Sequence, residues 1–411
     1  MPEVRAIVSL ILLLCAAIQV APAQWVSINR PTDPGYTRTQ CFTTDGSTLF
    51  AGTLGAGVFR IADLNGTWVR VSNGLTNNDV RGVHTGSSGL YATTANGIFR
   101  STNLGDNWGP VNNGVTNLNG RAISEGIGAV IAASFGGGFY YTTNNGASWT
   151  QANTGLPTLF LAALAVQGNT VFASAPSGVF RTTSLGGTWT TVNNGLASTN
   201  VGSFAVNGTN LYAFTFLLDA SAYRTTNLGD TWVQANSGLA STPETFAVAV
   251  GQNVIAGTAG SGFFVSTNAG ATWTASNAGF TLMAVRAITI FGTDVVAGTS
   301  DGGIWRRPLS QIVTSVRQEP GAVPGRFSLE QNFPNPFNPT TTIRFALPAQ
   351  AEVRLSVSDL TGREVAVLVD ESLGAGSYTA SWDAAGAASG VYFYRLTAGP
   401  YSAVRKLLVA K

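Results

Sequence analysis

The octapeptide Thr225-Thr226-Asn227-Leu228-Gly229-Asp230-Thr231-Trp232 decides the fold, because related runs recur along most of the chain. The tryptophans that end these runs follow one another at intervals of 40 to 43 residues. They are Trp68, Trp108, Trp149, Trp189, Trp232 and Trp273. A constant period of this length indicates a repeat architecture, in which each unit is one small group of secondary-structure elements.

Each repeat divides into four short strands separated by Gly and Asn turns. In the second repeat we expect strands at residues 80–84, 90–94 and 97–101, and Trp108 begins a fourth strand that ends at the turn 112–114. Short strands punctuated by such turn residues are typical of all-β proteins.

The number of repeats predicts how the chain closes. A three-strand core occurs seven times, but a fourth strand led by Trp follows only six of them. The seventh core ends at residues 304–307, and the missing strand stands at the front, at 25–29, with Trp25 lying 43 residues before Trp68. This pattern predicts an all-β, seven-bladed β-propeller closed by its N-terminal strand, which leaves no open sheet edge. An open solenoid explains the repeats but not the displaced strand.

The sequence changes character after residue 310. Residues 311–325 contain Pro and Gly and are typical of a linker. Residues 326–411 lack the repeat Trp and hold alternating strands, for example 353–357 and 390–396. We therefore expect a propeller over residues 24–310 and a separate C-terminal Ig-like β-sandwich over 326–411.

The N-terminus is typical of an export signal. Arg5 precedes an apolar run at residues 6–18, and Ala-Pro-Ala at 21–23 fits a cleavage site. The run is shorter than the roughly 20 residues that a bilayer span needs, so we expect no stable transmembrane segment. Residues 1–23 are therefore predicted to be a signal peptide.

Cysteine content and charge narrow the function further. Cys15 could mark a lipoprotein, but Leu14 before it is not the small residue that such processing favours. Cleavage after residue 23 would leave Cys41 alone, so no internal disulfide is expected. A net charge of +2, with no basic stripe, argues against a nucleic-acid partner.

The recurring octapeptides resemble the Asp-box (BNR) repeat, Ser/Thr-x-Asp/Asn-x-Gly-x-Ser/Thr-Trp. Runs that fit every position are 142–149, 225–232 and 266–273, and runs that depart from it are 63–68, 101–108 and 182–189. We expect the Asp or Asn to bond to the backbone two residues on, and the Trp to bury a large apolar area. The residues expected in these structural roles are Asp63, Trp68, Asn103, Trp108, Asn144, Trp149, Trp189, Asn227, Trp232, Asn268 and Trp273. The resemblance implies that the boxes lie opposite the ligand-binding face.

The C-terminal residues resemble the type A C-terminal sorting domain of the type IX secretion system. The matching pieces are residues 332–340, 359–365, 376–378, 382–383 and 390–396, followed by a basic end from Arg405 to Lys411. This resemblance implies that residues 326–411 engage the type IX secretion machinery. It also implies a mature protein that is secreted, outside the cell or at the outer-membrane surface.

Asp-box propellers include sialidases and xyloglucan-cleaving enzymes, so catalytic residues have to be considered. A classical glycosidase needs two carboxylates roughly 5–10 Å apart on the binding face. The propeller region contains only two glutamates, and Glu125 is expected near the opposite face. The acids expected in loops on the ligand side are Asp79, Asp219, Glu244 and Asp301, in different blades. His84 is more easily explained as a packed histidine than as a general base, and no metal or cofactor motif is present.

One set of residues indicates a binding site. Counting back nine residues from the second strand of each repeat gives the start of the innermost strand, near the channel mouth. The residues at this position are Gln40, Arg81, Arg121, Ala162, Gly202, Thr245 and Arg286. Around a closed ring the three arginines form one arc with Gln40 between them, which would suit a carboxylate or another anion. Alternatively, the arginines cap the strand entrance and stack on neighbouring loops.

Loops on the same face carry apolar side chains. They are Leu159, Phe160, Leu217, Leu218, Phe280, Leu282 and Met283. Exposed together they would form a contact patch for a partner, and folded over the blades they would only pack. We interpret the chain as a non-enzymatic binding module for a glycan or protein, with an extracellular glycoside hydrolase (sialidase-like or xyloglucanase-like) as the alternative.

Overall fold

The computed structural model describes residues 24–216, 221–242, 244–250, 253–312, 317–319, 322–338, 340–384 and 387–410. The expected signal peptide, residues 1–23, lies outside the described residues, as do Leu217, Leu218 and Asp219. Within the described ranges the chain is built of β-strands and one short helix, α1 (Leu309–Ile312). The expected all-β fold is therefore confirmed.

Strands β1 to β28 form seven four-stranded sheets. The innermost strands are β2 (Arg38–Thr44), β6 (Val80–Gly86), β10 (Gly120–Gly126), β14 (Leu164–Gln167), β18 (Val201–Asn207), β22 (Thr245–Val250) and β26 (Val285–Phe291). The second strands are β3 (Leu49–Leu54), β7 (Gly89–Thr94), β11 (Ala129–Ser134), β15 (Thr170–Ala175), β19 (Asn210–Thr215), β23 (Asn253–Thr258) and β27 (Asp294–Thr299). The third strands are β4 (Gly57–Ile61), β8 (Gly97–Ser101), β12 (Gly138–Thr142), β16 (Gly178–Thr182), β20 (Ala222–Thr225), β24 (Gly262–Ser266) and β28 (Ile304–Pro308). The outermost strands are β5 (Val69–Arg70), β9 (Gly109–Pro110), β13 (Thr150–Gln151), β17 (Thr190–Thr191), β21 (Val233–Gln234), β25 (Thr274–Ala275) and β1 (Val26–Ile28).

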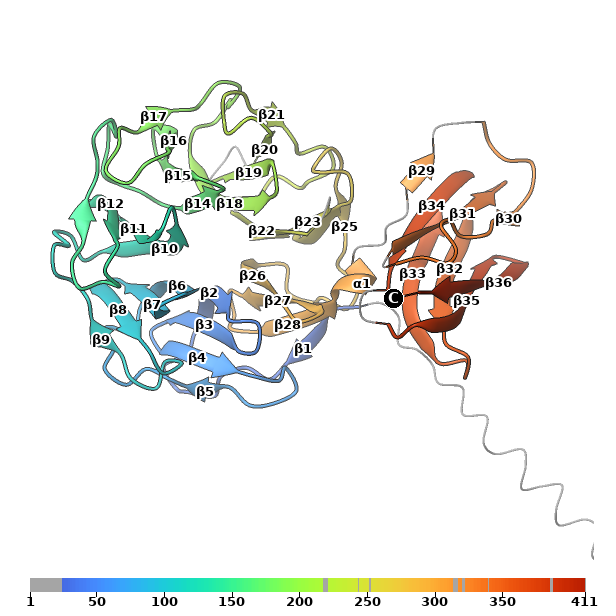
Figure 1. Cartoon of the computed structure of the whole chain (residues 1–411), viewed down its shortest axis with the longest axis horizontal. Coiled ribbons are helices and arrows are strands. Elements are labelled where there is room, and N and C mark those ends of the chain that lie inside the picture. The colour runs from blue at the N-terminus through green and yellow to red at the C-terminus, as the bar shows by residue number, and fades with distance from the viewer. Residues whose placement is uncertain are drawn as a thin grey trace, which may run out of the picture.

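These sheets are arranged around a common centre, with their innermost strands facing it (Figure 1). Each innermost strand contacts that of the next sheet, and β26 contacts β2, which closes the ring. Strand β1 pairs antiparallel with β28, placing Val26 opposite Arg306 and Ile28 opposite Ile304. The N-terminal strand thus completes the sheet of β26 to β28, as the displaced Trp25 predicts.

Apolar side chains fill the space between consecutive sheets. Between the first two sheets, Phe50 and Val58 pack with Leu90, Phe99 and Trp108, and all five are buried. Burial of such side chains on both sides of each sheet supplies most of the free energy that holds the ring together.

The recurring tryptophan links each sheet to the one before it. The indole nitrogen of Trp232 donates to the Val192 carbonyl oxygen at 2.8 Å, and Trp25 donates to Ser276 at 2.8 Å. Equivalent bonds are made by Trp68, Trp108, Trp149, Trp189 and Trp273. Trp25 therefore occupies the position of a repeat tryptophan, although its acceptor is 251 residues away in sequence.

A glycine beside every repeat tryptophan except Trp68 permits close packing of two backbones. The Trp232 nitrogen donates to the Asn194 carbonyl oxygen at 2.8 Å, and the next residue, Gly195, has a φ of +92°. A Cβ at Gly195 would overlap the Trp232 carbonyl oxygen. Both the positive φ and the lack of space therefore require glycine at this turn.

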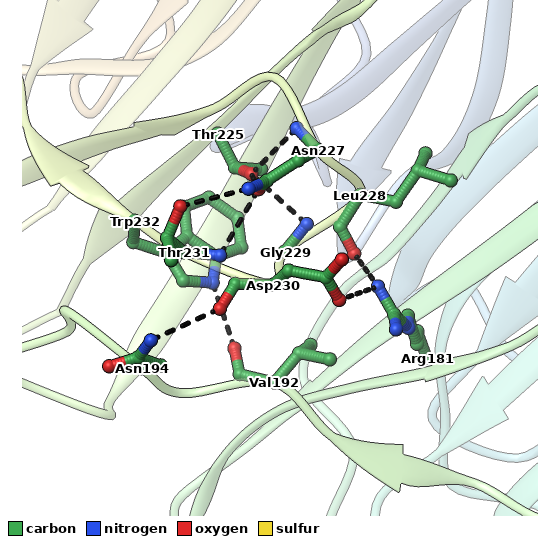
Figure 2. Close-up of polar contacts among 10 residues, drawn as sticks. All are labelled: Arg181, Val192, Asn194, Thr225, Asn227, Leu228, Gly229, Asp230, Thr231 and Trp232. Atoms are coloured by element: carbon green, nitrogen blue, oxygen red, sulfur yellow. Dashed lines mark hydrogen bonds and ion pairs between the residues drawn. The ribbon is translucent and has the colours of Figure 1, made fainter.

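The turn before Trp232 is fixed by bonds between side chains and backbone (Figure 2). The Asn227 Oδ1 atom accepts from the Thr231 nitrogen at 3.1 Å, and the Thr225 hydroxyl accepts from the Gly229 nitrogen at 3.0 Å. The expected bond from Asn227 to the backbone two residues on is therefore wrong, because the accepting oxygen reaches four residues on. A longer turn results, in which Gly229 and the residue before it both have positive φ.

The run at residues 63–68, which lacks the glycine of the complete runs, forms a different turn. There the Asp63 Oδ1 atom accepts from the Asn65 nitrogen at 2.9 Å, so the bond spans two residues as expected. The complete turn needs two residues in the left-handed region, and glycine provides one of them at little cost.

Arginines of the preceding sheet bind these turns from outside. Arg181 donates to the Leu228 carbonyl oxygen at 2.6 Å and lies 2.7 Å from Asp230 Oδ1 (Figure 2). Arg60 forms the same pair of contacts with an earlier turn, through Leu104 and Asp106. Arg60 and Arg181 are thus packing residues between sheets.

Replacing Asn227 with Ala is expected to lower the free energy of unfolding by about 1–2 kcal/mol, because the turn loses its shared acceptor. The Thr225 hydroxyl, which donates to Asn227 at 2.8 Å, and the Thr231 nitrogen would both lose a partner. Urea denaturation of the full chain measures the change. Asn96→Ala, at an exposed hairpin position, is the control and should leave the midpoint unchanged. Equal midpoints for both variants would contradict a structural role for Asn227.

The remaining strands form two further four-stranded sheets, in the orders β29-β34-β31-β30 and β33-β32-β35-β36. They are β29 (Arg317–Glu319), β30 (Ser328–Leu329), β31 (Thr340–Leu347), β32 (Ala351–Ser358), β33 (Glu364–Leu373), β34 (Gly376–Asp383), β35 (Gly390–Ala398) and β36 (Tyr401–Val409). Their inward-facing residues, among them Leu355, Trp382 and Tyr394, share one buried core. The segment 311–325, expected as a linker, instead contains the end of α1 and all of β29, and β29 pairs with β34.

Candidate functional site at the mouth of the ring

The predicted arginine position coincides with a recurrent irregularity of the innermost strands. In five of these strands the register shifts by one residue near the start, as in β6, where Val80 and Gly82 pair with consecutive residues of β7. The residues skipped by the pairing are Gln40, Arg81, Arg121, Gly202 and Arg286. A β-bulge leaves its extra residue out of the ladder and redirects its side chain. The three arginines and Gln40 thus share one backbone setting.

Arg81 bridges two sheets. Its Nε and Nη2 atoms donate to Asp79 Oδ2 at 3.1 and 2.8 Å, and its Nη1 atom donates to the side-chain oxygen of Asn119 in the next sheet. The guanidinium is mostly buried, which strengthens these charge-assisted bonds. The position of Arg81 is therefore fixed on both sides.

Arg121 has no carboxylate partner among the described residues. Its guanidinium carbon lies 4.8 Å from the ring centroid of Phe135, and its buried Nε atom has no hydrogen-bond partner. Burial and the neighbouring positive charge of Arg81 lower the pKa of Arg121 from its ordinary value. Arg81 and Arg121 thus bring two positive charges to neighbouring sheets, and the carboxylate of Asp79 pairs with Arg81 alone.

Arg286 lies in a second cationic cluster that includes a residue missed in the sequence. It forms an ion pair with Glu244 of the preceding sheet. Burial and the charge of Arg38 lower the pKa of Arg286, and the Nε atoms of both arginines are buried without a hydrogen-bond partner. Arg38 begins β2, two residues before Gln40, so a comparison of one position per repeat could not find it. The Gln40 side chain forms no hydrogen bond with a described residue.

The acidic residues expected on the ligand side are engaged by neighbouring groups. Asp79 and Glu244 pair with arginines, and Asp301 accepts from the Thr299 hydroxyl and from the Gly303 nitrogen. Asp219 lies outside the described residues. The described part of the mouth therefore presents arginines with bound acids, rather than two free carboxylates facing each other.

His84 and Glu125 form a contact between the second and third sheets. The Nε2 atom of His84 lies 3.9 Å from Glu125, which also accepts from the backbone and hydroxyl of Ser87 at 2.9 and 2.6 Å. Burial lowers the pKa of His84, and the Glu125 charge opposes this effect. These contacts support the interpretation of His84 as a packed histidine.

Two phenylalanines extend the mouth on the Arg121 side. The Phe135 and Phe160 rings lie with centroids 4.9 Å apart and planes tilted by 58°. Their exposed fractions are 38% and 47%, which is high for large apolar side chains. Phe135 was not predicted, but it follows the second strand directly, where five of the seven repeats have Gly, Ala, Pro or Ser. That difference between repeats is the signal that could have found it.

The other apolar loop residues divide into exposed and buried ones. Leu159 and Met283 are exposed at 36% and 40%. Phe280 is only 4% exposed and packs against Trp25, so of the two alternatives it follows the packed one. Phe280 is buried because Trp25, the residue directly before β1, packs against its ring in the same apolar core. Leu282 packs on the same core.

The described residues also limit other kinds of site. No group of three or more His, Cys, Asp and Glu side chains in these ranges is placed to hold a metal ion. Within the same ranges, no helix has the length and apolar character needed to cross a membrane. Cys41 is unpaired, and burial raises the pKa of its thiol to about 12.

Residues 331–410 match the family described as the secretion system C-terminal sorting domain. The match indicates a protein exported to the cell surface or the extracellular space, by the type IX route that the sequence resemblance implies. No curated protein matches the chain.

Several solved structures share the fold of the ring. YCF48 from Cyanidioschyzon merolae is 14% identical, with a TM-score of 0.55 over 70% of this chain and 99% of its own. Virginiamycin B lyase from Staphylococcus aureus is 15% identical, with a TM-score of 0.57 over 69% of this chain and 98% of its own. The WD40 β-propeller domain of Doa1 is 10% identical, with a TM-score of 0.51 over 69% of this chain and 96% of its own. These likenesses show a propeller of repeated four-stranded sheets, and at such low identity they show the fold alone.

Proposed function

We propose that residues 24–310 form a seven-bladed Asp-box propeller that acts as a non-enzymatic binding module for a glycan or protein. Residues 326–411, together with β29, would form an Ig-like sorting sandwich that engages the type IX secretion machinery. The ring would then be presented outside the cell or at the outer-membrane surface after removal of residues 1–23.

The arginines at the bulges carry this proposal. Arg81 and Arg121 occupy the same bulge position in neighbouring sheets, and Arg81 bonds to Asn119, two residues before Arg121. Arg286 and Arg38 lie on the contacting innermost strands β26 and β2. Fixed guanidinium groups with unbonded N–H donors bind carboxylates and other anions well, because each offers a planar fork. The Asp-box residues, in contrast, are engaged within the turns that hold the sheets together.

Two observations favour binding over hydrolysis. The ion pairs of Asp79 and Glu244 leave these acids poorly suited to the paired roles that glycoside hydrolysis requires. The structure of YCF48 bound to D1 peptide has the same fold, so a propeller of this shape can hold a peptide. A carboxylate-bearing glycan or protein segment is the ligand class that the arginines suit.

The double variant Arg81→Ala/Arg121→Ala is expected to lose most ligand binding on combined glycan and peptide arrays probed with the full chain. Each arginine removed should weaken binding about tenfold, because charged hydrogen bonds contribute about 1.5–3 kcal/mol. The matched control is Arg70→Ala/Arg363→Ala, which removes two ion-paired arginines away from the innermost strands. Thermal denaturation would verify that both variants fold. Undiminished binding by the mouth variant would contradict the proposed site, and release of sugar products from a bound glycan would favour the hydrolase.

A further inference from the structure

The Arg121 side of the mouth combines charge and exposed aromatic rings in one small area. We infer that Arg81, Asn119, Arg121, Phe135 and Phe160 form a subsite for a hexuronate residue of an acidic polysaccharide. This inference rests on the proposed function of the mouth as a binding face, and it names the chemistry of the ligand. The five residues are called the uronate subsite below.

The uronate subsite is held in place by the backbone of two sheets. The Phe135 nitrogen donates to the Asn119 carbonyl oxygen at 2.9 Å, and Phe135 forms an antiparallel bridge with Phe160. The Gly136 nitrogen donates to the Leu159 carbonyl oxygen at 2.9 Å. Both rings are therefore carried on bonded backbone rather than on free loops, which reduces the entropy lost when a ligand binds.

Contacts within the described chain cover only part of the surface of Phe135 and Phe160. In the described chain, Phe135 contacts Phe160 on one side and the Arg121 guanidinium on another, and both rings keep more than a third of their surface in water. Leaving large aromatic surface exposed is unfavourable for a protein that is exported to an aqueous environment. A ligand that covers the rings would recover this free energy.

The charges of the subsite favour an anion. Arg81 and Arg121 bring two positive charges, and the one carboxylate of Asp79 pairs with Arg81, so a net positive charge remains. The Nη1 atom of Arg81 donates only to the neutral side chain of Asn119, and Arg121 has a buried Nε atom without a partner. The Nε atom is out of reach of a ligand, but the Arg121 Nη atoms bond to no described residue and could donate to a ligand carboxylate without displacing the Asp79 pair.

A hexuronate carries both complementary features on one rigid ring. One face of a pyranose presents C–H groups that pack on aromatic rings, and its carboxylate projects from the ring edge. The Arg121 guanidinium lies over the Phe135 ring at 4.8 Å from its centroid, and Phe160 packs beside Phe135, so the positive charge borders the exposed aromatic surface directly. An acidic peptide bears its carboxylates on flexible side chains and has no flat apolar face beside each one. The combination of charge and adjacent rings thus favours a uronate over a peptide.

Isothermal titration calorimetry of the full chain tests the inference with three ligands of equal length. These are an oligogalacturonate, the corresponding neutral oligogalactoside and an oligoglutamate. We expect binding of the oligogalacturonate, weakening with added salt, and little binding of the neutral oligosaccharide. Phe160→Ser and Arg121→Gln should each weaken oligogalacturonate binding about tenfold, as expected when one anchor of a small site is lost.

Matched variants separate the subsite from general effects. Val233→Ser removes an apolar side chain that is 68% exposed on β21, and Arg70→Gln removes an ion-paired arginine on β5. Both should bind the oligogalacturonate like the unmodified chain. Binding of oligoglutamate that depends on Arg121 but not on Phe160 would overturn the uronate inference while leaving the proposed function intact. Equal weakening by the control variants, or no binding of the oligogalacturonate, would overturn the uronate inference, whereas undiminished array binding by Arg81→Ala/Arg121→Ala would overturn the proposed function.

Discussion

Replacing Trp25 with alanine is expected to lower the free energy of unfolding of the ring by about 3–5 kcal/mol, the range for large aromatic truncations in cores. The side chain is 2% exposed, stacks on Phe263 with ring centroids 3.7 Å apart, and donates to the Ser276 carbonyl oxygen. Its loss would also loosen β1, which covers the edge of β28. Urea denaturation of the full chain, followed by circular dichroism, measures the effect.

Variants at residues 25 and 26 separate the contribution of the aromatic ring of Trp25 from that of its indole hydrogen bond. Trp25→Phe keeps a ring against Phe263 but removes the indole donor, so about 1–2 kcal/mol of the loss should remain. Val26→Ser changes a half-exposed neighbour and should have almost no effect. If Trp25→Ala unfolded at the same urea concentration as the unmodified chain, β1 would not be closing the ring in solution.

Replacing Gly195 with alanine is expected to destabilise the ring by more than about 3 kcal/mol, because two unfavourable effects combine. The φ of +92° costs any side chain about 1–2 kcal/mol, and the new Cβ would also overlap the Trp232 carbonyl oxygen. The backbone bond between Asn194 and Trp232 would have to lengthen to relieve the overlap. Thermal and urea denaturation of the full chain report the loss.

A second glycine isolates the contribution of the backbone angle. Gly208, in the hairpin between β18 and β19, has a φ of +57°, and a Cβ at this position would meet no atom within 4 Å. Gly208→Ala should therefore cost only the conformational term, about 1–2 kcal/mol. Similar losses for the two alanine variants would show that contact with the tryptophan backbone contributes little to stability.

The repeat tryptophans predicted the architecture well, because each performs the same task in every sheet. A large ring that must be buried, next to a turn that needs glycine, leaves a strong periodic trace in the sequence. Trp25 could be assigned to the ring from its spacing alone, and the structure places it beside Ser276. Phe280 could not be judged in the same way, because its burial depends on contact with this distant strand.

The sequence predicted where in each repeat the candidate arginines lie, but not which side chains surround them. The arginines were found because the same position recurs in each repeat, and the structure adds that this position is a bulge. Their partners could not be foreseen, since Glu244 reaches Arg286 only across two neighbouring sheets. Arg38 and Phe135 were missed because neither belongs to the pattern that the repeats share.

The bulge at the start of the innermost strands has a consequence for how such rings diversify. A residue left out of the ladder escapes the inward and outward alternation that constrains its neighbours. In this chain the same bulge accommodates glutamine, arginine and glycine, although the flanking residues stay largely buried. The residue at this single position can therefore differ between repeats without altering the strand pairing on either side of it. A ring of similar repeats can thus carry a different side chain at each bulge, while the sheets that hold the bulges keep the same pairing.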